Sequence, residues 1–159
     1  MKLVISDIET ERLENPEKLW IFGGIDPETE EITRFEPFRG EEEVKKAIEW
    51  AESIDLWVGH NFLSFDAPNT NRLLGKDVIS KSRVIDTLVV SRLIKYDRYV
   101  PKGCKSGHSL KAHGIRLKTY KRDFDQFEEY SKEMVDYWED DLRTTLALYN
   151  DFYKYIRGS

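Results

Sequence analysis

The sequence contains little cysteine and no long apolar segment. Cys104 is the only cysteine among 159 residues, so an intramolecular disulfide is impossible and a reducing compartment is expected. Apolar runs such as 56–58 fall far short of the roughly 20 residues that a membrane-spanning helix needs. Asp7 interrupts the first apolar stretch too early for a signal peptide. We therefore expect a cytoplasmic protein with no membrane partner.

The chain does contain enough apolar and aromatic residues to build one core. Apolar residues make up 40% of the sequence and aromatic residues 13%. This composition excludes intrinsic disorder. The length favours a single domain over residues 1–159, because no repeat, low-complexity tract or linker divides the chain.

Net charge is low, but the charges are unevenly distributed. The formal net charge of −5 argues against a protein that is basic over its whole surface. Residues 92–122, here called the basic segment, hold ten Lys or Arg and one acid, giving +9 against −14 for the rest. Tyr96, Tyr99 and Tyr120 lie among these cations, a pattern that suits single-stranded nucleic acid because bases stack and phosphates pair with cations. A solvated lysine-rich loop is the alternative.

The order of the expected elements predicts an α/β protein. Alternating apolar residues and turn residues mark five strands, at 2–6, 19–25, 32–38, 55–60 and 84–85. Helical spacing marks five helices, at 41–52, 65–74, 87–94, 109–113 (ended by Gly114) and 132–156. Turn residues at 26–29 indicate a hairpin between the second and third strands. Three strands followed by mostly helices imply a mixed central β-sheet flanked by helices.

An acid pair ends the first expected strand. Asp7 and Glu9 are two residues apart, so on a strand both carboxylates point to one face and can reach one ion. The pair is weak evidence alone, since Asp26 and Glu28 repeat the spacing within a plain turn. We expect the first pair at an edge of the sheet, where functional sites form.

Two further acidic clusters lie downstream. Residues 61–66 follow the fourth strand and combine Asn61, Phe65 and Asp66 at a spacing that chance rarely gives. Tyr137 and Asp141 are four residues apart on the last helix and therefore share a face. Each cluster has a plainer alternative: an acid that serves a helix dipole, or a solvated acidic patch.

The three clusters together indicate a metal-dependent site. Asp7, Glu9, Asp66 and Asp141 come from distant segments, and four carboxylates are costly to bury together without a counter-ion. Hard divalent cations remove that cost, so two ions, Mg²⁺ or Mn²⁺, are expected. Two such ions about 4 Å apart are the usual arrangement for phosphodiester hydrolysis. Zinc is not expected, because the histidines and the cysteine lack the spacing of a closed zinc site.

On these motifs the chain resembles the DEDD (DnaQ-like) 3′–5′ exonucleases, which have a ribonuclease H-like fold. The resemblance covers essentially the whole chain and is strongest to the tyrosine subtype, because the histidine subtype would need His in place of Asp136. Segments 85–94 and 107–117 look especially like the proofreading domain of phage family-A DNA polymerases. The resemblance implies a 3′–5′ exodeoxyribonuclease in bacterial or phage-infected cytoplasm. It would release nucleoside 5′-monophosphates from single-stranded DNA during replication or repair.

The same resemblance implies a role for each acid. Asp7, Glu9 and Asp141 would hold the ion that activates water. Asp7 would bridge to a second ion, which Asp66 would help to hold. Tyr137 would hydrogen-bond to the attacking water and orient it.

Four residues are implied in substrate binding: Thr10, Leu13, Asn61 and Phe65. Thr10 would meet the terminal 3′-hydroxyl through its backbone, and Leu13 would wedge between the last two bases. Asn61 would lie near the penultimate phosphate. An ordinary packing role is the alternative for Leu13, and His60 is interpreted as a plain residue at a strand end.

Two other functions stay open. An exoribonuclease would use the same acids and differ in recognising the 2′-hydroxyl, for which the sequence shows no pattern. A catalytically silent module that docks on a separate DNA polymerase or replication protein would leave the complete acid set unused. The chain stops 18 residues after Asp141. Either a free-standing exonuclease or an excised domain is therefore expected.

Overall fold

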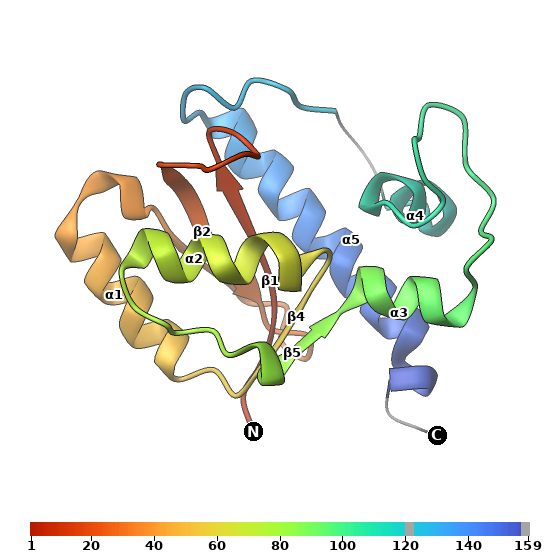
Figure 1. Ribbon diagram of the computed structural model, residues 1–159, viewed down its shortest axis with the longest axis horizontal. Helices are drawn as coiled ribbons and strands as arrows, with labels where there is room; N and C mark the ends of the chain where they lie inside the picture. Colours follow the sequence, from red (N-terminus) through yellow and green to blue (C-terminus); the bar gives the residue numbers. More distant parts are fainter. Residues whose placement is uncertain (120–122, 157–159) are drawn as a thin grey trace.

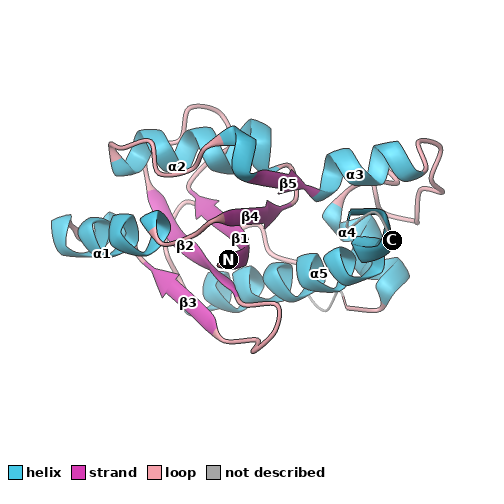
Figure 2. Ribbon diagram, turned by 90° about the horizontal axis from the view of Figure 1, so that it is seen from below, coloured by secondary structure: helices cyan, strands magenta, loops and turns pink. Residues whose placement is uncertain are grey.

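A mixed five-stranded sheet forms the centre of the computed structural model, which describes residues 1–119 and 123–156. Tyr120 of the basic segment lies outside the described residues. The strands are β1 (Leu3–Thr10), β2 (Leu19–Ile25), β3 (Ile32–Phe35), β4 (Leu56–Gly59) and β5 (Val84–Asp86). Their order is β3-β2-β1-β4-β5, with β1, β2 and β3 antiparallel in turn and β4 and β5 parallel to β1 (Figures 1 and 2).

Within the described residues five α-helices accompany the sheet: α1 (Glu41–Glu52), α2 (Ala67–Leu74), α3 (Thr87–Ile94), α4 (Leu110–Leu117) and α5 (Lys132–Ile156). Figure 2 shows α1 and α2 on one side of the sheet and α5 on the other. Shorter helical turns occupy Pro37–Arg39, Phe62–Asp66 and Lys81–Arg83. Among the described residues, no helix is both long and apolar enough to cross a membrane.

The two faces of the sheet bury alternate residues, as a strand's period of two requires. Ile8 and Trp57 pack with the helices α1 and α2, whereas Ile5 and Val58 pack beneath α5. Both faces are therefore covered. The predicted mixed central β-sheet flanked by helices is confirmed.

The first strand is longer than expected and the acid pair lies within it. β1 continues to Thr10 because β2 pairs with it antiparallel, setting Asp7 opposite Gly23 and Glu9 opposite Ile21. The prediction that the pair ends the strand at a sheet edge is wrong, since β1 is the central strand. However, β4 pairs with β1 only over residues 3–5. The acids therefore lie where the central strand runs beyond its parallel neighbour.

Two helix boundaries also differ from expectation. The segment expected to start a helix at Phe65 begins as a π-helical turn at Phe62, and α2 starts only at Ala67. The helix expected to stop at Gly114 instead runs to Leu117, with Gly114 buried inside it. A glycine within a helix costs about 1 kcal/mol, and the packing of a buried helical face outweighs a cost of that size.

Candidate active site

A cleft of about 480 Å³ opens beside the end of β1, next to the segment that follows β4. Its walls come from β1, the loop after it, the segment 60–66 and α5. The cleft brings together all nine residues that the sequence predicts for the site: Asp7, Glu9, Thr10, Leu13, Asn61, Phe65, Asp66, Tyr137 and Asp141. His60 and Phe127, which were not predicted as site residues, also line it.

Three carboxylates converge at the floor of this cleft. Asp7, Glu9 and Asp141 each offer one oxygen, and these atoms all lie within 4.8 Å of one another. Asp66 is buried beside them, where its Oδ2 accepts a hydrogen bond from the Ile8 N–H at 3.1 Å. Of these four acids, two come from the central strand, one from α5 and one from the π-helical turn before α2, so the tertiary fold assembles the cluster.

The electrostatics of the cluster favour a bound cation. Burial raises the pKa of all four carboxyl groups well above their usual values, and for Asp7, Glu9 and Asp141 the next cause is a neighbouring acid of the cluster. The side chains of Asp7 and Asp66 lie close enough that each carboxyl group shifts the pKa of the other.

An orphaned oxygen provides a separate test of whether these residues fit a metal. The Oδ2 atom of Asp7 is buried and has no hydrogen-bond partner among the described residues. A buried polar atom without a partner costs about 1–3 kcal/mol, and more when it is charged. Asp7, Glu9 and Asp141 each contribute a convergent carboxylate oxygen, and these three form the hard, oxygen-only donor set that Mg²⁺ and Mn²⁺ prefer.

Tyr137 reaches the same floor from α5. Its side chain hydrogen-bonds to Asp141 one helical turn later. Its ring packs against Phe124 and Phe127, with ring centroids 5.6 and 6.0 Å away. Next to it on the helix, Trp138 Nε1 donates to the Asp7 carbonyl oxygen at 2.9 Å, which fastens α5 to the central strand. The phenol is therefore held between an aromatic wall and the acid cluster.

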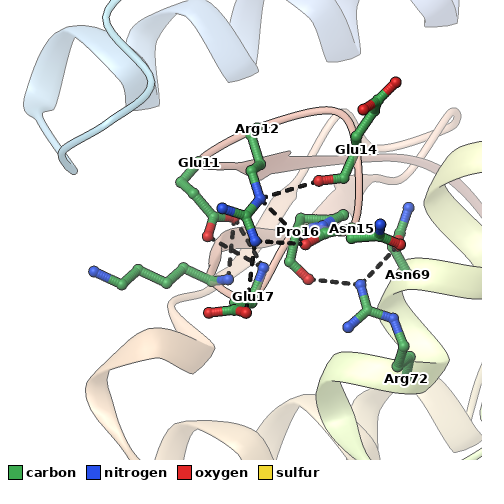
Figure 3. A network of polar contacts seen from close by, with 9 residues as sticks. Glu11, Arg12, Glu14, Asn15, Pro16, Glu17, Asn69 and Arg72 are labelled. Carbon is green, nitrogen blue, oxygen red and sulfur yellow. Dashed lines mark hydrogen bonds and ion pairs between the residues drawn. The ribbon is translucent and has the colours of Figure 1, made fainter.

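The loop after β1 carries Leu13 to the rim of the cleft. Figure 3 shows the polar contacts that Arg12 and Arg72 make with the backbone of this loop. Arg12 closes the loop by donating through Nε to the Glu14 carbonyl at 3.0 Å and through Nη2 to the Asn15 carbonyl at 3.0 Å. Arg72 of α2 anchors it from outside, donating to the Pro16 carbonyl at 2.6 Å. The Leu13 side chain is 81% exposed, so it does not pack in the core. The loop thus presents an exposed leucine on a fixed backbone.

Asp86 is a structural acid that the sequence interpretation missed. This buried residue ends β5, and its carboxylate accepts from the N–H groups of Asn61, Leu63 and Leu88 at 2.9–3.0 Å. It therefore caps α3 and fixes the backbone of the segment that delivers Asp66. An acid between a strand and a helix is an N-cap signal, and that signal alone could have identified it.

His60 bridges the cleft wall and the segment before α4. Its Nε2 donates to the His108 carbonyl oxygen at 2.7 Å, and its Nδ1 lies 2.8 Å from the Thr87 hydroxyl. Burial lowers the pKa of His60 to about 4, which keeps the ring neutral at pH 7. These contacts agree with the interpretation of His60 as a structural residue.

The central strand bearing the acids, the β3-β2-β1-β4-β5 order and the covering helices define a ribonuclease H-like domain. A family model described as the RNase_H superfamily matches residues 4–153, and the chain belongs to this superfamily. No curated protein matches the sequence.

A solved structure with a similar fold is the family B DNA polymerase from the hyperthermophilic archaeon Pyrobaculum calidifontis. The match has a TM-score of 0.67 and 16% sequence identity, covering 94% of this chain and 24% of the polymerase. This chain therefore spans about a quarter of that protein's length. At this identity the likeness shows the fold alone.

Proposed function

We propose that this protein is a metal-dependent nuclease that removes nucleotides from the 3′ end of single-stranded DNA. It would belong to the tyrosine subtype of the DEDD exonucleases, acting in replication or repair. The observation that carries the proposal is the convergence of Asp7, Glu9 and Asp141 within 4.8 Å, with Asp66 and Tyr137 in the same cleft.

Each acid has a role in the proposed reaction. Asp7, Glu9 and Asp141 would hold one divalent cation, and Asp66 would help Asp7 to hold a second. Such cations would supply a lowered pKa for the attacking water and an offset to the charge that develops on the leaving oxygen. The Tyr137 hydroxyl, already held beside Asp141, orients the water toward the phosphorus by a hydrogen bond.

The substrate contacts follow from the cleft walls. Leu13 and Phe65 line one cleft together with Thr10. We assign to Leu13 and Phe65 the contacts with the terminal bases, and to Thr10 the contact with the 3′-hydroxyl. Asn61, exposed beside them, is assigned to the adjacent phosphate.

The direct test uses 5′-labelled single-stranded DNA and the matching RNA, each incubated with the protein in Mg²⁺, Mn²⁺ or EDTA. We expect the DNA to shorten stepwise from its 3′ end with either metal and to stay intact in EDTA. Faster shortening of RNA would replace the proposal with an exoribonuclease. Intact strands in every lane would instead favour a silent binding module.

Loosening the loop that carries Leu13 should slow the hydrolysis of DNA whose 3′ end is paired more than that of a single strand. In Arg12→Met the two carbonyl contacts are lost, together with a 3.5 Å ion pair to Glu17, so the loop no longer holds Leu13 rigid. Exposed contacts of this kind contribute about 1 kcal/mol together. We expect a fivefold to tenfold loss of rate, as an order of magnitude, on a DNA whose 3′ end is paired, and little loss on a single strand.

The matched control is Arg34→Met, which removes an exposed arginine of β3 that is paired with Glu36. Steady-state rates on the paired and unpaired substrates give the comparison. Equal losses on both substrates would mean that Arg12 serves general stability and not the wedge.

A further inference from the structure

An exposed aromatic face begins at the end of α3 and continues into the loop before α4. Leu93 and Tyr96 are each 81% exposed, and Tyr99 is 78% exposed. Figure 1 shows this loop, in green, projecting away from the sheet beyond α3 and α4. Among the side chains that the structure describes, no other aromatic one is as exposed as these two tyrosines, since the next, Tyr153, is 43% exposed. Neighbouring large side chains this exposed suggest a surface that meets a ligand.

The structure separates the cations of the basic segment into two groups. Arg98 and Arg116 face inward: Arg98 lies over the Phe152 ring at 5.5 Å, and Arg116 donates to the Tyr99 carbonyl at 3.1 Å. Lys111 forms an ion pair with Asp123 at 3.6 Å. The cations with exposed side chains are Arg92, Lys95, Lys102, Lys105 and Lys118. Lys121 and Arg122 lie outside the described residues.

The backbone beneath the two tyrosines is fixed by a chain of buried polar groups. Arg116 donates to His113 Nδ1 at 2.8 Å, so His113 must donate through Nε2 to the Ser91 hydroxyl at 2.9 Å. Ser91 then donates to His108 Nδ1 at 2.7 Å, and His108 Nε2 donates to the Tyr96 carbonyl at 2.6 Å. The rings are therefore presented on an ordered backbone, which lowers the entropy lost on binding.

This face adjoins the proposed active-site cleft. His60 lines the cleft and donates to the carbonyl of His108, whose ring holds Tyr96. Arg92 lies near enough to His60 to act on its charge, contributing to the lowering of the pKa of that ring. Arg92 and the segment before α4 are therefore both neighbours of His60 at the edge of the cleft.

We propose that Arg92, Lys95, Tyr96, Tyr99, Lys102 and Lys105, here called the strand platform, bind the single strand on the 5′ side of the nucleotide held in the cleft. The inference rests on the proposed function. Charge complementarity selects the occupant, because the basic segment carries +9 while the rest of the chain carries −14. The tyrosines stack on bases and the cations pair with phosphates, which gives binding without sequence preference.

The test measures binding without cleavage. Fluorescence anisotropy in EDTA reports the affinity for labelled single strands of about 3 and about 20 nucleotides, the shorter of which is meant to fill only the cleft. One variant combines Tyr96→Ser with Tyr99→Ser, and a second combines Lys95→Gln, Lys102→Gln and Lys105→Gln. The control combines Lys45→Gln and Lys46→Gln, two exposed lysines on α1.

If the strand platform binds DNA, the substitutions should weaken the binding of the long strand and leave the short strand unaffected. The tyrosine variant should bind the long strand at least about fivefold more weakly. The lysine variant should lower the slope of log affinity against log salt by about 2, at roughly 0.7 per lost phosphate contact. Both variants should hydrolyse the short strand at the wild-type rate, and the control should match wild type throughout.

The outcomes separate the two proposals. Unchanged long-strand affinity and salt slope in both variants would overturn the strand platform, even if the wild type degrades DNA from its 3′ end. The expected binding losses without any metal-dependent hydrolysis would support the platform and contradict the exonuclease. Equal losses with the short strand would overturn a separate platform, because they would place the tyrosines in the cleft.

Discussion

Replacing Asp7 by Asn is expected to abolish hydrolysis while making the metal-free protein more stable. Asp7 belongs to both proposed cation sites, so the substitution should lower turnover by a factor of at least about 10³, a typical loss when a metal site's charge is removed. Without metal, however, Asp7 is a buried carboxyl crowded by Asp66 and Glu9. A neutral amide of the same shape relieves that repulsion, and we expect a gain of about 1–2 kcal/mol in unfolding free energy.

Two measurements check this pair of effects. Single-turnover hydrolysis in Mg²⁺ gives the catalytic loss, and urea unfolding in EDTA gives the stability. Added Mg²⁺ should stabilise the wild type, by about 2.7 kcal/mol at a hundredfold excess over its dissociation constant, and leave Asp7→Asn nearly unchanged.

The matched control is Asp151→Asn, which neutralises an exposed acid on α5. It should behave as wild type in both measurements. Near-native hydrolysis by Asp7→Asn would remove Asp7 from the catalytic site. Lower stability of Asp7→Asn in EDTA would mean that contacts within the protein stabilise the Asp7 carboxyl group even without a cation.

The acids of the site could be predicted because their spacings follow local geometry. Two residues along a strand and four along a helix each share a face whatever the rest of the fold does, so Asp7 with Glu9 and Tyr137 with Asp141 were recognisable from sequence. The helices at 41–52 and 87–94 were predicted for the same reason, and the structure has these bounds.

Features that depend on distant partners could not be predicted in this way. The end of β1 is set by pairing with β2, and sequence periodicity does not reveal that register. Gly114 is a helix terminator by propensity but is buried within α4. Asp86 stabilises the segment around Asn61 through hydrogen bonds to residues 23 and 25 positions away, which only the folded chain brings together.

The buried histidines should each contribute a loss of stability in mild acid. Burial lowers the pKa of His60 to about 4 and that of His113 to about 3, against about 6.5 in an unfolded chain. Between these values the unfolded chain binds more protons than the folded protein, so stability rises with pH and falls on acidification. From pH 7 to pH 5 each histidine should cost about 2 kcal/mol, or about 4 kcal/mol together.

Unfolding in EDTA at pH 7 and pH 5 tests this with His113→Gln. The glutamine amide can still donate to Ser91 in place of His113 Nε2, but it has no proton to gain. The carboxylate cluster acts in the opposite sense, since its raised pKa values favour the folded protein at low pH. Its contribution to the pH dependence is the same in wild type and variant, so it cancels when their losses of stability are compared.

We expect His113→Gln to be less stable than wild type at pH 7, because Arg116 loses its acceptor on the ring. Its further loss between pH 7 and pH 5 should be smaller than that of wild type by about 2 kcal/mol. Parallel losses in the two proteins would mean that folding does not lower the pKa of His113, so that Nδ1 gains its proton in mild acid at no cost to stability. The Arg116 contact at Nδ1 would then not hold the ring neutral, and the donor chain that reaches Tyr96 would not depend on that contact.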